Sequence, residues 1–95
     1  MQITAEVIII WKFGLHIRPA AHIVNLLKGF SCNIVFEKNG ERCNAKSPMQ
    51  LLTLAAAAGE TIQITTEGED ADAAMNALLN FFRNYQDGNS VADLK

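Results

Sequence analysis

The chain has 95 residues, of which 49% are hydrophobic and 19% charged, and its net charge is −2. This length is typical of one domain with a modest core, which leaves little room for a deep enzyme pocket with its own lid. The acidic balance gives no electrostatic drive toward nucleic acid, and the apolar run from Val7 to Trp11 is far shorter than the roughly 20 residues that span a bilayer. With no signal-peptide pattern and only two cysteines, we expect a cytoplasmic protein without membrane insertion.

The first part of the chain predicts a strand and then a helix. Residues 3–10 (ITAEVIII) are rich in strand-forming side chains. Apolar residues then recur at helical spacing on one face, namely Ala20, Ile23, Val24 and Leu27. Pro19 stands in the first turn of this helix, where a missing amide hydrogen costs nothing, and Gly29 follows its end.

A hairpin is predicted next. Residues 31–37 and 42–46 flank Asn39-Gly40, which is a strong signal for a two-residue turn, and in that register Phe36 pairs with Cys43. One face of the hairpin is then apolar and consists of Cys32, Ile34, Phe36, Cys43 and Ala45. The other face is polar apart from Val35, so helices must cover this sheet on one side only.

The second part predicts a helix, a strand and a last helix. Ser47 is a typical N-cap with Pro48 at the first helical position, residues 61–66 alternate as a strand, and apolar residues recur helically over about 69–85. The order βαββαβα indicates an α+β fold, an open-faced two-layer sandwich in which three helices cover one face of a four-stranded antiparallel sheet. We expect one domain over residues 1–85 and a frayed tail over 86–95.

His16 stands just before the first helix becomes apolar on one face, so we expect its ring to be accessible. The first amides of a helix have no intrahelical acceptor, which makes a helix N-terminus a ready site for an anion such as phosphate. Arg18 adds a planar fork of donors that suits phosphate oxygens, and an imidazole beside such a pocket can be a nucleophile toward phosphorus. The residues alone leave two interpretations open: a phosphoryl carrier, or a histidine that only flanks a helix near a surface arginine.

The segment GLHIRPAA (14–21) resembles the active-site signature of the histidine-containing phosphocarrier (HPr) family of the bacterial phosphoenolpyruvate-dependent sugar phosphotransferase system. Residues 45–78 resemble the second helix, fourth strand and third helix of the same family, and the resemblance covers about residues 3–85. It implies that His16 accepts a phosphoryl group on Nδ1 from phosphorylated Enzyme I and passes it to the IIA domain of a sugar permease. Arg18 would neutralise the phosphate during both transfers. Mg²⁺ and phosphoenolpyruvate belong to Enzyme I in this scheme, so no cofactor is expected on this chain.

Ser47 is the second candidate site. In many bacteria the matching serine of the resembled family is phosphorylated by HPr kinase/phosphorylase. The resemblance therefore implies regulatory phosphorylation at Ser47, in addition to its role as an N-cap. Phosphate at a helix N-terminus is tolerated electrostatically. Pro48 departs from the family, which usually has a flexible apolar residue at that position.

An apolar surface patch is expected around His16. Its members are apolar residues that neither core face claims, namely Phe13, Ile17, Ala20, Met49 and Leu52. On the resemblance, this patch docks Enzyme I and the IIA domain, and its basic surroundings favour brief contacts with acidic partners.

The remaining histidine and the two cysteines predict no metal site and no disulfide. His22 lies six residues after His16, about 240° around a helix, so the two rings diverge and His22 is expected to be solvated. Cys32 and Cys43 share the core face but lie beyond disulfide reach in the predicted register, so we expect two small buried side chains.

Two other functions stay open at this point. One is a nitrogen-branch or purely regulatory phosphocarrier, and the other is a noncatalytic protein-binding module that uses the same patch without turnover at His16. The loop Trp11-Lys12-Phe13 is bulkier than is usual in the resembled family, which predicts a narrower choice of partners. We expect a monomer that carries phosphoryl groups stoichiometrically and is not an enzyme by itself.

Overall fold

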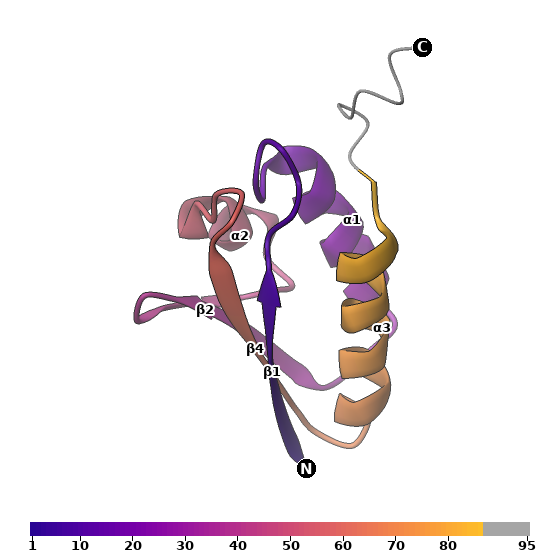
Figure 1. Ribbon diagram of the computed structural model, residues 1–95. Helices are drawn as coiled ribbons and strands as arrows, with labels where there is room; N and C mark the ends of the chain where they lie inside the picture. The colour runs from indigo at the N-terminus through magenta and orange to yellow at the C-terminus, as the bar shows by residue number, and fades with distance from the viewer. Residues whose placement is uncertain (87–95) are drawn as a thin grey trace.

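The computed structural model describes residues 1–86 (Figure 1). Apart from Gln86, the tail predicted over 86–95 lies outside the described residues. Within the described part of the chain, no helix is long and apolar enough to cross a membrane.

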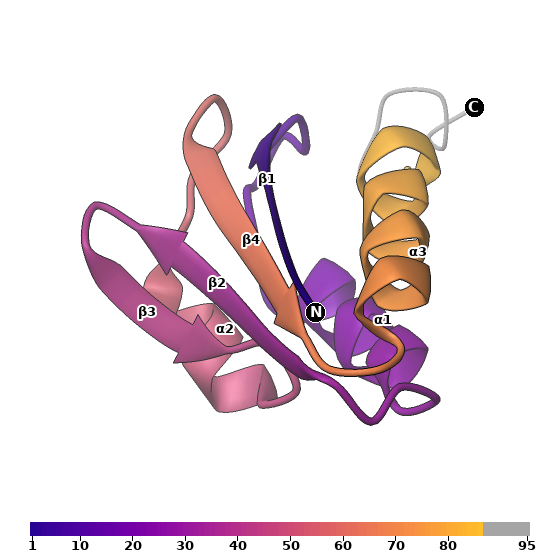
Figure 2. The same cartoon turned by 90° about the horizontal axis from the view of Figure 1, so that it is seen from below.

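One antiparallel sheet forms the base of the molecule. Its strands are β1 (Gln2–Ile8), β2 (Asn33–Lys38), β3 (Glu41–Asn44) and β4 (Thr61–Glu67), in the spatial order β1-β4-β2-β3. The helices are α1 (Ile17–Leu27), α2 (Pro48–Leu54) and α3 (Ala71–Asn84), and all three lie on one side of the sheet (Figure 2). This arrangement confirms the predicted open-faced βαββαβα sandwich.

Alternation along the strands decides which side chains enter the core. Ile62 and Ile64 of β4 are fully buried under the helices, whereas Gln63 between them is exposed on the bare face. On β2, Ile34 and Phe36 follow the same rule. The core therefore lies between this face and the apolar stripes of the helices.

The β2–β3 hairpin has the predicted turn and register. Phe36 pairs with Cys43, and the turn residues Asn39 and Gly40 have φ angles of +52° and +85°, as a two-residue turn of this type requires. The ends of the two strands differ by one or two residues from the predicted 31–37 and 42–46. The predicted apolar face is confirmed, because all five of its residues are buried: Cys32, Ile34, Phe36, Cys43 and Ala45.

Two further predicted boundaries were wrong by two residues. The first strand ends at Ile8 rather than residue 10, although the Ile9 amide still donates to the Glu60 carbonyl and the Ile9 carbonyl accepts from the Gly59 amide, just before β4. The last helix begins at Ala71 rather than residue 69. The carboxylate of its N-cap Asp70 accepts from the amides of Ser31 and Cys32, at 2.8 and 2.9 Å, and so ties the segment before β2 to the start of α3.

Candidate functional site

The loop between β1 and α1 is fitted closely against the end of α2. The Gly14 amide donates to the Trp11 carbonyl at 2.9 Å, which closes a turn, and the Leu15 amide donates to the Ala56 carbonyl at 2.8 Å. Gly14 has a φ of +69°, and a Cβ there would lie 2.4 Å from the Ala56 oxygen. Only glycine fits at this position, so the loop that leads to His16 is held in one path.

His16 is the N-cap residue of α1, as the sequence predicts. Its backbone is extended, with φ −94° and ψ −170°, and its carbonyl accepts from the Ala20 amide at 3.1 Å. Its side chain makes no capping hydrogen bond to the helix and is half-buried. The imidazole therefore lies at the helix N-terminus without using the helix amides.

The first turn of α1 presents donors to an anion. The amides of Ile17 and Arg18 have no acceptor within the helix, and Pro19 has no amide hydrogen. The helix dipole adds partial positive charge at the same end. The Arg18 side chain is exposed two residues after His16, and no acid lies between Trp11 and Lys28. This end of the helix therefore favours an anion such as a phosphoryl group beside the imidazole.

Phe13 stands next to the imidazole, and Lys12 stands next to Phe13. The ring of Phe13 is perpendicular to that of His16 with centroids 6.1 Å apart, and the Lys12 ammonium lies 5.5 Å from the Phe13 centroid. Phe13 is 55% exposed. An aromatic side chain and a further cation therefore border the surface around His16.

The predicted apolar patch exists, with one correction. Ile17 and Met49 are 69% and 71% exposed, Phe13 is exposed, and Leu52 is half-buried. Ala20 is only 1% exposed, so the expectation that it belongs to no core face was wrong. Its methyl group points from α1 into the core together with Ile23 and Leu27, and its helical spacing with those residues already indicated this.

A shallow groove separates α1 from α2. It has a volume of about 410 Å³, and its lining includes Ile17, Ala20, Val24, Met49 and Leu52 together with Lys28. The remaining patch residues, Phe13, Ile17, Met49 and Leu52, are called the docking patch below. The patch joins the groove to the surface around His16, so a protein partner could contact both at once.

Ser47 has the capping role that the sequence predicts. Its hydroxyl accepts from the Gln50 amide at 3.3 Å, and Pro48 occupies the first turn of α2. Ser47 is half-buried, whereas Met49 beside it is exposed. The cap is a structural role that needs no phosphorylation.

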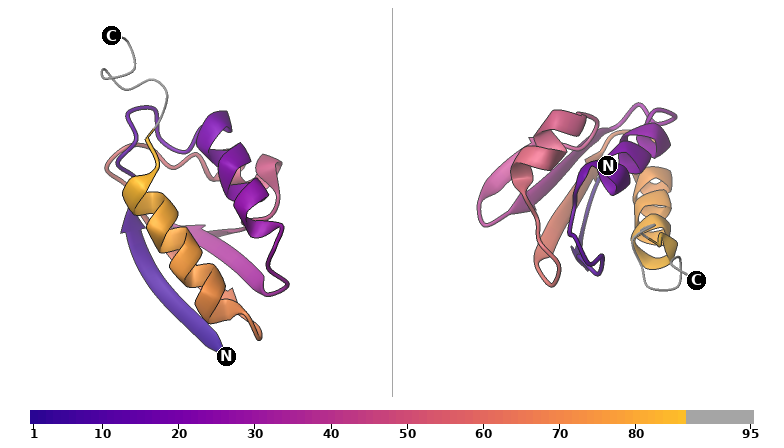
Figure 3. Two further views of the ribbon diagram at one scale, coloured as in Figure 1. Left: turned by 90° about the vertical axis from the view of Figure 1, so that its right-hand side faces the viewer. Right: turned by 90° about the horizontal axis from the view of Figure 1, so that it is seen from above.

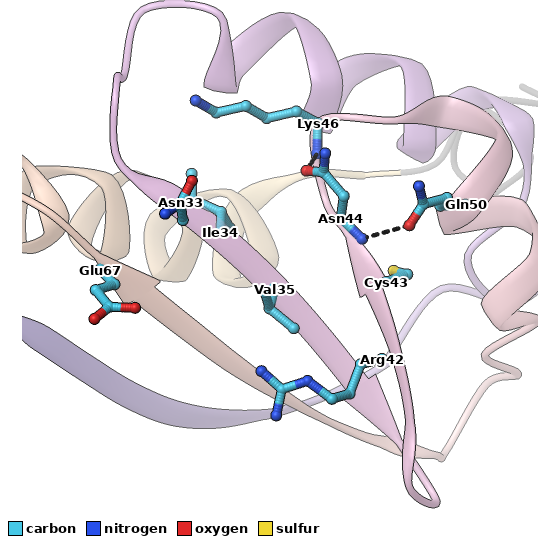
Figure 4. A pocket seen from close by; sticks show the side chains of 9 residues that line it. All are labelled: Asn33, Ile34, Val35, Arg42, Cys43, Asn44, Lys46, Gln50 and Glu67. Carbon is cyan, nitrogen blue, oxygen red and sulfur yellow. Dashed lines mark hydrogen bonds between the residues drawn. The ribbon is translucent and has the colours of Figure 1, made fainter.

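A hollow of about 470 Å³ lies beside the start of α2 (Figure 4). Its polar groups bond to one another: the Asn44 amide donates to the Gln50 side chain at 2.7 Å, and the Lys46 amide donates to the Asn44 side chain at 2.9 Å. The Lys46 ammonium donates to the Phe30 carbonyl at 2.6 Å. These bonds connect the end of β3 to α2 and to the Phe30 carbonyl, close to the N-cap Ser47.

His22 and the cysteines match their predicted exposure. His22 is exposed, but its ring also packs 5.0 Å from that of Tyr85, a contact with the end of α3 that the sequence did not predict. Cys32 and Cys43 are buried free thiols. Burial raises the pKa of both thiols, and hydrogen bonding to Asp70 adds to the rise for Cys32. Neither is thereby a reactive nucleophile at neutral pH.

Trp11 is the residue of this region that sequence reasoning missed. The sequence predicts only a bulky loop here, whereas the Trp11 side chain is 3% exposed and stacks on Phe82 of α3 at 5.1 Å. The apolar run that ends at Trp11 was a signal for this burial, because nothing polar separates Trp11 from the strand.

Comparison with known proteins assigns the family. The family model described as "PTS HPr component phosphorylation site" matches residues 3–84. The HPr-like protein Crh of Halalkalibacterium halodurans is 47% identical over 70 residues, which cover 74% of this chain and 83% of that protein. The crystal structure of the phosphocarrier protein HPr from Bacillus anthracis has a TM-score of 0.79 and 41% identity, and the match covers 84% of this chain and 95% of that one.

These matches agree with the fold and with the site at the start of α1. The chain has an open-faced sandwich with a histidine at the N-terminus of α1. These two features define the class of phosphotransferase-system carrier domains that the sequence resembles. The chain belongs to the HPr family of the phosphotransferase system. A further solved relative, an HPr dimer from Thermoanaerobacter tengcongensis, has a TM-score of 0.68 and 37% identity, covering 74% of this chain and 80% of that one.

Proposed function

We propose that this chain carries phosphoryl groups in a sugar phosphotransferase system, accepting them on His16 from phosphorylated Enzyme I and delivering them to the IIA domains of sugar permeases. One observation carries the proposal. The N-cap residue of α1 is a histidine whose side chain does not cap the helix, so a nucleophile and the helix amides lie together at the surface. The family model for a phosphorylation site, which spans this residue, supports the same assignment.

The transfer needs only the imidazole and a partner. The lone pair of Nδ1 of His16 attacks phosphorus and forms a P–N bond, while the bond from phosphorus to the donor breaks and its electron pair stays with the donor. Delivery to a IIA domain repeats the step in reverse roles. Arg18 and the amides at the start of α1 stabilise the charge on the phosphoryl oxygens during both transfers.

The docking patch of Phe13, Ile17, Met49 and Leu52 is the surface proposed for both partners. Its exposed apolar side chains offer contact area, and Lys12, Arg18 and Lys28 around it attract an acidic partner surface. Because the same patch must release one partner before it binds the next, a small contact suits the task. We expect the carrier to work as a cytoplasmic monomer that binds no cofactor and does not turn over without its partners.

Phosphorylation with defined partners tests the proposal. The chain is incubated with Enzyme I, Mg²⁺ and phosphoenolpyruvate, and its intact mass is measured before and after mild acid. We expect one added phosphoryl group that acid removes. The group should be absent in His16→Ala and present in His22→Ala, a matched exposed histidine on the same helix.

The same assay separates the rival functions. A mass gain only with the nitrogen-branch Enzyme I would assign the chain to that branch. No gain with either Enzyme I would contradict the carrier proposal and favour a binding module, whose partner affinity would survive in His16→Ala.

A regulatory function at Ser47 is the second candidate. The family resemblance at this serine suggests it, and Ser47 stands at the N-terminus of α2 beside the exposed Met49 of the docking patch. The test is incubation with HPr kinase/phosphorylase and ATP. An acid-stable phosphate that is lost in Ser47→Ala would support regulation, and an unmodified chain would contradict it.

A further inference from the structure

Trp11 is the one buried side chain in the stretch from Ile10 to Phe13. Its exposed fraction is 3%, against 64% for Ile10 and 55% for Phe13, and Lys12 is exposed as well. The segment therefore lies on the surface with a single large side chain turned inward. That side chain is also the only tryptophan in the sequence.

The indole is enclosed by the last turn of α3. It stacks on Phe82 at 5.1 Å, and the rings of Phe81 and Tyr85 meet it edge-on at 5.7 and 5.5 Å. Its Nε1–H donates to the carbonyl oxygen of Tyr85 at 3.2 Å. Tyr85 is the C-cap of α3, where a carbonyl has no donor within the helix, so this bond satisfies both groups.

The turn at residues 11–14, which carries Trp11, is also attached to the end of α2. The Gly14 amide donates to the Trp11 carbonyl, and the next residue, Leu15, is bonded to Ala56 just beyond α2. The loop thus spans the ends of two helices, and in Figure 3 it lies beside the last turn of α3. His16 follows directly, with its own amide bonded to the Gly14 carbonyl at 3.0 Å.

We propose that Trp11 is a positioning residue for phosphoryl transfer: by clamping the loop to the end of α3, it sets where the His16 imidazole stands relative to the first amides of α1. The inference rests on the function proposed above. The physical reason is that phosphoryl transfer requires close alignment of the nucleophile, and a displacement of about 1 Å can cost as much as a hundredfold in rate. Two anchors on one short turn leave the imidazole little freedom to shift.

The conservative variant Trp11→Phe removes the indole N–H and part of the ring but keeps an aromatic side chain. Its matched control is Ile34→Val, a small core substitution on β2, which belongs to neither the loop nor α3. Both are compared with the wild type at a temperature where all three are folded. Measured quantities are the kcat and KM for phosphorylation by Enzyme I and the NMR signals of the His16 imidazole and of the Gly14, Leu15 and Ile17 amides.

We expect Trp11→Phe to lower kcat about tenfold with little change in KM, and to shift the His16 signals, while Ile34→Val changes neither. Equal kinetics and unmoved His16 signals in Trp11→Phe would overturn the positioning role. A loss that Ile34→Val shares would overturn it too, because it would reflect stability alone.

The NMR measurement separates this inference from the proposed function. If the wild type accepts no phosphoryl group, the carrier function fails, yet the His16 signals still report whether Trp11 positions the imidazole. In a functional carrier, the emission of the sole tryptophan should also change on phosphorylation of the wild type and stay constant in His16→Ala. A constant emission in both would contradict the coupling between Trp11 and His16.

Discussion

α1 and α2 differ in whether a side chain caps their first amides. At α2 the Ser47 hydroxyl accepts from the Gln50 amide, and a network around Asn44 and Gln50 braces the same end. At α1 the N-cap His16 makes no such bond with its side chain. Capping by Ser or Thr is typically worth about 1 kcal/mol. α1 therefore forgoes this stabilisation, and the His16 side chain does not occupy the first amides of its helix.

The largest expected effect on stability concerns the loop that leads to α1. Gly14→Ala should destabilise the fold by about 3 kcal/mol, because the new Cβ meets the Ala56 oxygen and φ is positive. Urea unfolding measures this loss. Gly29→Ala is the matched control, since no atom lies within 4 Å of its added Cβ, and it should change stability by less than about 0.5 kcal/mol. Equal losses would show that the loop is not held as described.

Arg18 should matter to transfer and hardly to folding. Arg18→Ala is expected to lower the rate of phosphorylation by Enzyme I about a hundredfold, because a charged donor is lost from the transferring group. The rate of Arg18→Lys should lie between those of the wild type and Arg18→Ala, since lysine keeps the charge without the planar fork. Arg83→Ala, on the exposed last turn of α3, is the control that should leave the rate unchanged. A normal rate in Arg18→Ala would remove Arg18 from the site.

Substitutions of the two N-cap residues measure how much side-chain capping contributes at each helix. Ser47→Ala should cost about 1 kcal/mol of unfolding free energy, while His16→Ala should change it by less than about 0.5 kcal/mol. His16→Ser should stabilise the fold by about 0.5 kcal/mol. The gain is small because the Arg18 amide is the donor within reach and Pro19 has none. Thermal unfolding of the three variants measures this order, and a destabilised His16→Ser would contradict the comparison.

The N-cap residue of α3, Asp70, makes the stability of the protein depend on pH. Hydrogen bonds, foremost from the Ser31 amide and then from Cys32, hold the pKa of Asp70 below its ordinary value. A lowered pKa in the folded state stabilises the protein above the ordinary value, and this stabilisation is lost as the pH falls through the folded pKa. Asp70→Asn should therefore be less stable than wild type at pH 7 and converge with it in acid. Unfolding between pH 2 and 7 tests this, with Asp72→Asn as the control.

The pKa of Glu60 is lowered as well. The Ala57 amide, 2.6 Å away, is the main cause, and the Lys38 ammonium at 3.3 Å adds to it. Asp70→Asn therefore removes only part of the acid sensitivity, and the double variant with Glu60→Gln should be flatter still.

Much of this molecule could be predicted because local patterns and tertiary packing agree. Asn39-Gly40 determined the hairpin register, and the alternation along the strands identified the buried face from the residues alone. His16 and Arg18 could be placed at the start of α1 because the first turn of a helix has a recognisable beginning. The family resemblance then supplied the chemistry that is proposed for them.

What escaped prediction depends on contacts between distant segments. Trp11 bonds to Tyr85 across 74 residues of chain, and Asp70 meets Ser31 across 39, so no local pattern could show either contact. Ala20 was misplaced for a different reason. Its small side chain fits both a core stripe and a surface near the site, and only its 1% exposure decides between them.

The pairing of β1 with β4 alone has a consequence for biosynthesis. Residues 2–8 bond to residues 61–67, so the first strand leaves the ribosome about 60 residues before its partner exists. At about 5–20 residues per second, it waits for roughly 3 to 12 s with its backbone groups unpaired. During translation, the nascent chain therefore depends on structure that forms locally, such as α1 and the β2–β3 hairpin, and the sheet closes late.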